Sequence, residues 1–230
     1  GMKALHVVGA RPNFMKLAPV HRALAAYPDV QQVIVHTGQH YDRKMSGLFL
    51  DELGIPAPDY NLHVGSASHA VQTAHIMEGM EPVIMAETPD VVVVYGDVNS
   101  TAAAALVASK LLVPVVHVEA GLRSFDNRMP EEVNRRVTDS VSTLFLTPSV
   151  DANHNLAREG VPAAAIHLVG NVMIDTLVRS LPGAGREWAR LPAELGVADR
   201  EYVLATIHRP SNTDAAGQLA KVAAALREIS

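Results

Sequence analysis

The 230-residue sequence contains no cysteine, which excludes disulfides, thiolate catalysis and zinc sites with cysteine ligands. It also lacks a run of about 18 apolar residues, so no segment is predicted to span a membrane. The net charge of −5 gives no electrostatic reason to expect nucleic acid or an anionic membrane surface as a partner. Hydrophobic residues make up 48% of the chain, which is enough for a substantial core. We therefore expect a soluble, cytoplasmic protein.

Short apolar segments alternate with longer helical patterns along most of the chain. The predicted strands cover residues 4–8, 33–36, 91–94, 113–118, 144–146 and 166–169. The predicted helices cover residues 12–26, 45–53, 69–86, 99–111, 130–141, 150–159 and 171–181, with Asn99 or Ser100 capping the fourth. The segment 91–94 is apolar on both faces, as in central strands of parallel sheets. Regular alternation of strands and helices predicts an α/β fold with a doubly wound parallel sheet.

The character of the sequence changes after residue 181. Residues 182–200 are punctuated by proline and glycine, which predicts a linker or hinge. Residues 202–207 then predict a strand and residues 215–229 a helix, the opening unit of a second Rossmann-like domain. We expect a complete N-terminal Rossmann-like domain over residues 1–181. The second domain, over residues 201–230, is expected to be only begun, as in a truncated chain.

Three acidic residues lie at strand ends or at a helix start. Asp97 follows the strand 91–94, Glu119 directly follows the strand 113–118, and Glu131 lies in the first turn of the next helix. In open α/β sheets the ligand crevice lies at the carboxyl ends of the strands. Asp97 could instead cap a helix, and Glu131 could stabilise a helix dipole. Glu119 is followed by small residues that leave space beside its carboxylate, which makes it the strongest candidate for a functional role.

Basic residues accompany two predicted turns between a strand and a helix. Arg11 and Lys16 lie at the first turn, where a helix N-terminus attracts anions. His208 and Arg209 lie at the last turn, where a cation pair could bind a pyrophosphate. Solvated turns are the alternative in both places. The first turn lacks the dinucleotide fingerprint, and the histidines lack metal-ligand spacing, so we expect neither a cofactor nor a metal.

Several longer motifs run along nearly the whole chain. They are Gly-Ala-Arg-Pro-Asn-Phe-Met-Lys (9–16), His-Thr-Gly-Gln-His-Tyr (36–41), Tyr-Gly-Asp-Val-Asn-Ser-Thr (95–101), His-Val-Glu-Ala-Gly-Leu-Arg-Ser (117–124), Met-Pro-Glu-Glu-Val-Asn-Arg (129–135), Val-Gly-Asn-Val-Met-Ile-Asp (169–175) and Thr-Ile-His-Arg-Pro-Ser-Asn-Thr-Asp (206–214). Together they resemble the non-hydrolysing UDP-N-acetylglucosamine 2-epimerase family. The resemblance implies the GT-B architecture, in which two Rossmann-like domains enclose a cleft.

The resemblance also implies a reaction. Family members eliminate UDP in an anti sense to form a 2-acetamidoglucal, and UDP then adds back with inverted configuration at C2. Such a reaction needs carboxylates that stabilise oxocarbenium character and that exchange protons on both faces of C2. The resemblance assigns catalytic roles to Asp97, Glu119, Glu131 and His208, and substrate binding to Arg11, Lys16, Gln39, His40 and Arg209. Which carboxylate serves which face stays open.

The resemblance implies a UDP-sugar substrate, a homodimer and a role in cell-surface polysaccharide precursor synthesis. Alternatives within enzymes are a 2-epimerase of a modified sugar, such as UDP-2,3-diacetamido-glucuronate, and a hydrolysing epimerase. A GT-B glycosyltransferase or a non-catalytic nucleotide-sugar sensor would belong to another class, and three clustered acids argue against both. Because the family's uridine-binding positions belong to the second domain, we expect this chain alone to bind UDP weakly and to turn over little.

Overall fold

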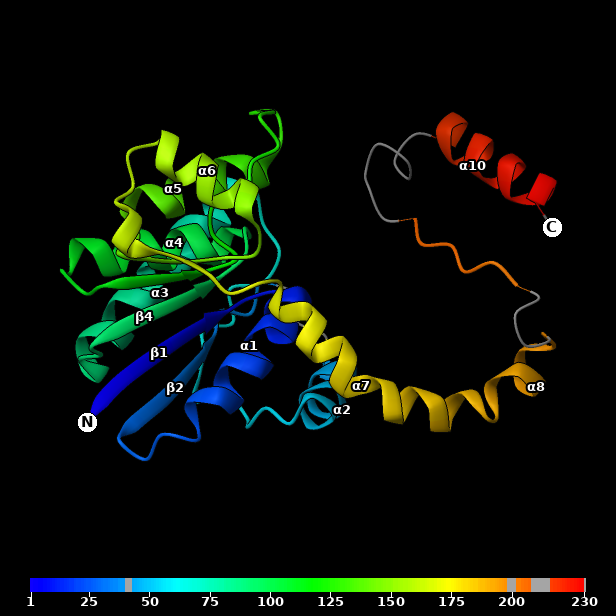
Figure 1. The fold of residues 1–230 in the computed structure, drawn as a ribbon, viewed down its shortest axis with the longest axis horizontal. Helices are drawn as coiled ribbons and strands as arrows, with labels where there is room; N and C mark the ends of the chain where they lie inside the picture. Colours follow the sequence, from blue (N-terminus) through cyan, green and yellow to red (C-terminus); the bar gives the residue numbers. More distant parts are fainter. Residues whose placement is uncertain (40–42, 198–201, 208–215, 230) are drawn as a thin grey trace. The chain divides into compact units, whose positions relative to one another are not determined.

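The computed structural model describes residues 1–39, 43–197, 202–207 and 216–229. The chain divides into two compact units, Gly1–Ser180 and Leu181–Ser230. The first unit is a seven-stranded parallel sheet with helices on both faces (Figure 1). This arrangement confirms the predicted doubly wound α/β fold.

All strand pairs in the sheet are parallel, and the spatial order is β3-β2-β1-β4-β5-β6-β7. The strands are β1 Met2–Val8, β2 Val30–His36, β3 Tyr60–Asn61, β4 Val91–Tyr95, β5 Val115–Val118, β6 Leu144–Thr147 and β7 Ile166–Leu168. The helices of this unit are α1 Arg11–Leu24, α2 Arg43–Leu53, α3 His69–Glu87, α4 Asn99–Lys110, α5 Pro130–Val141, α6 Val150–Arg158 and the short η1 Ala163–Ala165. The helix α7 Val172–Trp188 begins in the first unit and ends in the second, which also contains α8 Leu191–Leu195 and α10 Ala216–Ile229.

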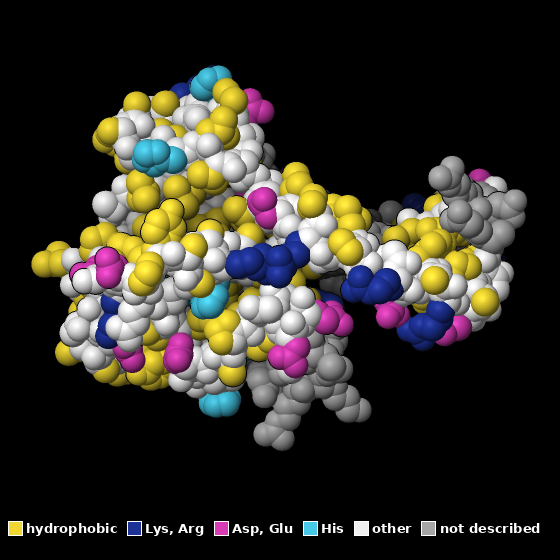
Figure 2. Space-filling model, turned by 60° about the horizontal axis from the view of Figure 1, so that its bottom comes forward, with side chains coloured by type: hydrophobic (Ala, Val, Ile, Leu, Met, Phe, Trp, Pro, Cys, Tyr) yellow, Lys and Arg dark blue, Asp and Glu magenta, His cyan; other side chains and the backbone are white. Residues whose placement is uncertain are grey.

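Alternation along β1 divides the core into two layers. Leu5 and Val7 pack with α3 and α4 on one face of the sheet, whereas Ala4 and Val8 pack with α1 and α2 on the other. Both layers are needed because the central strands are apolar on both sides, so each face must be covered to remove it from water. Hydrophobic side chains also reach the surface (Figure 2). Ile174, Leu177 and Val178 on α7 are among the exposed ones. No helix within the described residues has the length and apolarity that a bilayer span requires.

Some predicted elements differ from those observed. The expected cap by Asn99 or Ser100 was wrong, because Val98 holds the N-cap position and Asn99 is already helical. The two-residue strand β3 was not predicted, since two residues are too few to show an alternating pattern. Residues 202–207 were predicted as a strand but have no regular secondary structure, because no described neighbouring strand offers them a ladder of hydrogen bonds.

The segment predicted as a linker is partly helical. The helix α7 passes through Pro182, and α8 follows it. A proline inside a helix removes its own backbone hydrogen bond and crowds the carbonyl of residue i−4, but a helix can bend there and continue. The predicted domain limits at residues 181 and 201 stay a prediction.

Candidate active site

The strand order places a topological switch between β1 and β4, and this is where ligands bind in open α/β sheets. The side chain of Asn13, in the first turn of α1, joins the turns that follow these two strands. Its Oδ1 accepts hydrogen bonds from the backbone N–H groups of Gly9, at 3.0 Å, and Ala10, at 3.2 Å. Its Nδ2 donates to the carbonyl of Tyr95 at 3.1 Å. The turn after β1 is therefore fixed to the end of β4, beside Asp97.

Asp97 lies in the turn after β4, and α5 holds it in place. The guanidinium of Arg135 donates to its carboxylate, with Nη1 2.8 Å from Oδ2. The side-chain amide of Asn134 donates to the backbone carbonyl of Asp97 at 2.9 Å. Both the carboxylate and the backbone of Asp97 are thus tied to one helix.

Glu119 lies directly after β5 with a φ of +72°, which is unusual for a residue other than glycine. Such a conformation costs about 1–3 kcal/mol and is found most often at functional sites. Its Oε1 accepts from Nζ of Lys16 at 2.9 Å, and the Lys16 side chain is only 7% exposed. This ion pair joins the end of β5 to α1.

Gly96 allows that ion pair to lie beside the Asp97 turn. Its φ is +67°, and a Cβ atom there would lie 2.7 Å from Nζ of Lys16 and 3.7 Å from Oε1 of Glu119. Any side chain at this position would displace the lysine. The carboxylate of Glu119 is therefore a direct neighbour of the turn that carries Asp97.

Asp97 and Glu131 line one cavity of about 260 Å³, together with Gln39, Asn99 and Asn134. Pockets for drug-sized ligands run from about 300 to 1,000 Å³, so this one suits a fragment the size of a sugar ring. Glu131 is exposed and has no ion pair with any described residue. One acid with a cationic partner and one without it thus face the same space.

Amide side chains also line this cavity. Oε1 of Gln39 accepts from the backbone N–H of Ser100 at 3.0 Å and from its hydroxyl at 2.5 Å. Nδ2 of Asn99 donates to Oε1 of Gln72 at 2.9 Å and to Nδ1 of His69 at 3.0 Å. Asn99 therefore links α3 and α4 at the cavity instead of capping its own helix.

The remaining predicted site residues, catalytic and binding, lie elsewhere or outside the described residues. Arg11 begins α1, is exposed, and stacks over the ring of Phe49 with 4.7 Å from Cζ to the ring centre. His40, His208 and Arg209 lie outside the described residues. Their roles, like the binding role of Lys16, stay predictions.

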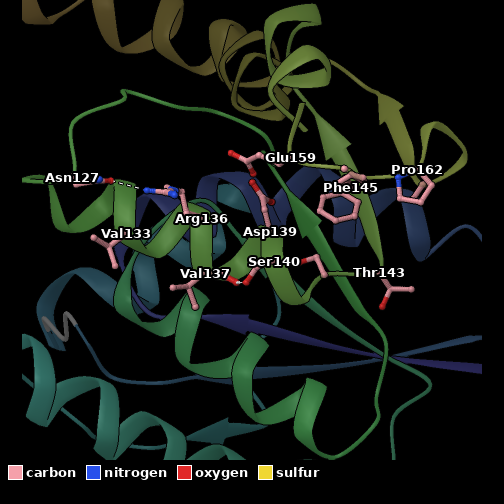
Figure 3. A pocket seen from close by; sticks show the side chains of 14 residues that line it. Asn127, Val133, Arg136, Val137, Asp139, Ser140, Thr143, Phe145, Glu159 and Pro162 are labelled. Atoms are coloured by element: carbon pink, nitrogen blue, oxygen red, sulfur yellow. Dashed lines mark hydrogen bonds between the residues drawn. The ribbon is translucent and has the colours of Figure 1, made fainter. Parts of the chain in front are cut away.

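A second, larger cavity of about 840 Å³ lies between α5, β6 and the segment that runs from the end of α6 to η1 (Figure 3). None of the predicted site residues lines it. Its two carboxylates are already engaged, because Arg123 pairs with both Asp139, at 2.8 Å, and Glu159, at 2.7 Å. Arg136 points toward Asn127 and donates to its side chain at 2.9 Å. The charged side chains of this larger cavity therefore already have partners, whereas Glu131 in the smaller cavity has no ion pair with a described residue.

Among the described residues, no group of three or more potential ligands could hold a metal ion.

The residues that hold Asp97 were not predicted from the sequence. Glu132 is buried and accepts from the backbone N–H of Phe125, at 2.5 Å, and from Nε of Arg135, at 3.1 Å. Burial raises the pKa of the Glu132 carboxyl, but these bonds and that of Ser124 outweigh it and lower the pKa overall. Helical spacing could have revealed the group, since residues three and four positions after Glu131 share its face.

Comparison with known proteins gives a consistent result. The family model described as UDP-N-acetylglucosamine 2-epimerase matches residues 22–230. A UDP-N-acetylglucosamine 2-epimerase homolog of Methanococcus maripaludis is 47% identical over 93% of this chain and 59% of its own length. The UDP-2,3-diacetamido-2,3-dideoxy-D-glucuronate 2-epimerase of Pseudomonas aeruginosa is 45% identical over 99% of this chain and 63% of its own length.

A solved structure is similar over the same extent. The crystal structure of the Methanocaldococcus jannaschii UDP-GlcNAc 2-epimerase, in complex with UDP-GlcNAc and UDP, matches with a TM-score of 0.90 and 42% identity. The match covers 99% of this chain and 62% of that one. The chain thus spans about three fifths of the length of the relatives it matches.

Proposed function

Because the chain belongs to the UDP-N-acetylglucosamine 2-epimerase family, we propose that its protein interconverts UDP-N-acetylglucosamine and UDP-N-acetylmannosamine. The observation that carries the proposal is the shared cavity of Asp97 and Glu131 at the switch point, with the Glu119–Lys16 pair beside it. A sugar ring fits this space, Asp97 and Glu131 line it, and the carboxylate of Glu119 lies beside the turn that carries Asp97. The P. aeruginosa relative supports a second candidate substrate, UDP-2,3-diacetamido-glucuronate, on which the same C2 chemistry would act.

In the proposed reaction the bond between C1 and the diphosphate oxygen breaks first, and its electron pair leaves with UDP. The oxocarbenium character that develops at C1 acidifies the hydrogen on C2, and nearby carboxylates stabilise the positive charge. One carboxylate then removes the C2 proton, and a C1–C2 double bond forms. A proton returns to the opposite face of C2, and UDP adds back to C1. Protons must be handled on two faces, which requires more than one acid or base.

The positions of the three acids suit a reaction in which different carboxylates stabilise charge at C1 and transfer protons at C2. Asp97 and Glu131 reach the cavity from different elements, a strand end and a helix start. Lys16 pairs with Glu119 at 2.9 Å and so fixes this carboxylate beside the turn that carries Asp97. The roles of His208 and Arg209, the homodimer, the cytoplasmic location and the limits of the two domains belong to the same proposal.

The test is incubation of this chain with UDP-N-acetylglucosamine in heavy water, at stoichiometric protein, followed by NMR of the sugar. We expect deuterium at C2 and slow formation of the manno epimer. Asp97→Asn should lower the exchange rate by about 100-fold or more. The control Arg128→Gln changes a side chain that is 91% exposed and should leave the rate unchanged.

Other outcomes would identify other functions. Sugar transfer without deuterium at C2 would contradict the proposal and indicate a glycosyltransferase. Release of free N-acetylmannosamine would indicate a hydrolysing epimerase. Exchange with UDP-2,3-diacetamido-glucuronate and not with UDP-N-acetylglucosamine would move the proposal to the modified sugar.

A further inference from the structure

A buried ionic cluster lies behind the candidate active site. His117 on β5 is fully buried, and both of its ring nitrogens are in close contact with oxygen atoms. Nδ1 lies 2.6 Å from Oδ1 of Asp139, and Nε2 lies 2.7 Å from the carbonyl oxygen of Gly96. Arg123 lies on the far side of Asp139 and pairs with its Oδ2 at 2.8 Å. The cluster joins β5, α5 and the turns after β4 and β5.

The partners of His117 determine where its protons lie. A backbone carbonyl can only accept a hydrogen bond, so Nε2 must carry a proton toward Gly96. Oδ2 of Asp139 already accepts from the backbone N–H of Gly121, at 3.0 Å, and from Arg123. Arg123 is a permanent cation and compensates the negative charge of the Asp139 carboxylate. Asp139 is therefore an ionised acceptor, and Nδ1 carries the second proton.

We propose that His117 is a doubly protonated imidazolium that acts as a positioning residue, holding the turns of Asp97 and Glu119 for the 2-epimerase reaction. The inference rests on the proposed function above. His117 and Arg123 then contribute two positive charges, which Asp139 and Glu159 balance. A buried ionic cluster persists when its charges balance and its hydrogen-bonding groups have partners.

The cluster reaches both turns through the backbone. The carbonyl that accepts from His117 belongs to the peptide bond between Gly96 and Asp97, so it fixes the orientation of that bond. The N–H that donates to Asp139 belongs to Gly121, two residues after the strained Glu119. Asp139 lies on α5, the helix that begins beside Glu131. One cluster thus sets three acidic residues relative to one another.

His117 acts through other groups and not on the sugar. Its side chain is fully buried, and it does not line the cavity shared by Asp97 and Glu131. The conservative variant Asp139→Asn separates its charge from its geometry. An asparagine oxygen can still accept from Gly121 and Arg123, while its NH₂ group would donate to Nδ1 of His117. That variant removes the Nδ1 proton and keeps the bond from Nε2 to Gly96.

The first test is long-range proton–nitrogen NMR of the histidine rings at neutral pH, on the 230-residue chain. We expect two N–H protons on His117 in the unsubstituted protein and one in Asp139→Asn. His117→Gln removes both signals and so assigns them. A neutral ring with a single proton in the unsubstituted protein would overturn the inference.

The second test measures positioning, by amide hydrogen exchange at Gly96 and Gly121. In His117→Gln we expect the protection of both amides to fall at least about tenfold, with Val94 in β4 unchanged as the control for folding. If His117→Gln does not fold, His117→Asn, which also lacks the ring, carries the same comparison at both amides. Unchanged protection in either folded variant would overturn the positioning role.

The third test uses the C2 exchange reaction. A displacement of about 1 Å can lower a rate by about 100-fold, so in His117→Gln we expect a fall of that size in kcat with KM within about threefold. Asp139→Asn keeps the bonds to both turns, so its kcat should fall less. A change in KM alone would overturn the inference. If the unsubstituted chain shows no exchange at all, the proposed function fails, while the ring protons and amide protection still decide the state of His117.

Discussion

The two compact units of the chain differ in where their apolar side chains lie. In Gly1–Ser180, large side chains such as Leu17 and Tyr95 are completely buried. None of the described residues of Leu181–Ser230 is buried, and Val203 and Leu204 are 69% and 83% exposed. Both units contain helices, so local helix preference is present in each. The two units differ in how much apolar surface they bury. Burial of apolar side chains, and not helix preference, supplies most of the stability of helices in folded proteins.

The ion pairs of the two units differ in the same way. Arg123 pairs with Asp139 and Glu159, and its side chain is 1% exposed. Arg190 also pairs with two acids, Glu187 and Glu194, but its side chain is 61% exposed. Equal numbers of partners thus occur in opposite environments. The loss of a buried partner leaves an uncompensated charge, whereas water replaces an exposed partner.

The largest expected effect therefore comes from the matched substitutions Arg123→Gln and Arg190→Gln. Arg123→Gln leaves Asp139 and Glu159 without their shared cation, and we expect the free energy of unfolding to fall by about 3–5 kcal/mol. Arg190→Gln should leave the unfolding midpoint unchanged. Urea denaturation of both variants measures the difference. Equal losses would contradict the contrast between the units.

Two leucines offer the same comparison without charge. Leu17 is completely buried between α1 and the sheet, whereas Leu204 is 83% exposed. Leu17→Ala removes buried contacts and leaves a cavity, so we expect a loss of roughly 3 kcal/mol. Leu204→Ala should change the free energy of unfolding by less than about 0.5 kcal/mol. Denaturation curves of the two variants give both values, and a large effect of Leu204→Ala would show that its unit has a packed core.

The same contrast explains what could be predicted of the fold. Strands such as β1 and β4 were predictable because a central parallel strand needs apolar residues on both faces, and this leaves a continuous apolar segment in the sequence. Residues 202–207 have the same composition but no regular secondary structure. An apolar composition favours a strand, but a strand forms only where a neighbouring strand provides backbone hydrogen bonds. The end of a helix before Pro182 was predicted wrongly for a related reason. Packing and the neighbouring helical turns also decide whether a helix ends at a proline.

The candidate site was predictable where topology alone decides a position. Asp97 and Glu119 follow strands, and the ends of neighbouring parallel strands lie at one edge of the sheet. The residues that hold them were missed because their importance depends on partners far away in the sequence. His117 lies inside a strand, and only the structure shows that its two nitrogens contact residues 21 and 22 positions away.

Acid should destabilise the first unit through a buried histidine. Burial and, less strongly, the charge of His21 lower the pKa of His6 to about 4, although a hydrogen bond to Gln32 partly opposes them. In the unfolded chain the pKa of His6 is 6.5. Between this value and about 4, His6 is therefore protonated in the unfolded state and neutral in the native state. The free energy of unfolding should therefore fall as the pH drops from 6.5 to about 4, by at most about 3 kcal/mol for this group. His36, whose pKa burial also lowers to about 4, contributes in the same direction.

The measurement is urea denaturation at several pH values, with His6→Gln as the comparison. The variant removes one titrating group and should lose part of the slope between about pH 6.5 and pH 4. An unchanged slope would show that the pKa of His6 is not lowered in the native state. The sign is specific, since a stabilised histidine cation would give a protein that gains stability in acid.

The smallest expected effect belongs to removal of the second unit after Leu181. The buried apolar residues lie in the first unit, and Thr176 anchors the start of α7 through a hydrogen bond from its hydroxyl to the carbonyl of Met15, at 2.6 Å. A chain of residues 1–181 keeps all of these contacts, so its free energy of unfolding should match that of the 230-residue chain within about 0.5 kcal/mol. Far-UV circular dichroism can follow both, because the single tryptophan, Trp188, lies in the part removed. A loss above about 1 kcal/mol would mean that the second unit stabilises the first, and the boundary proposed at residue 181 would then be wrong.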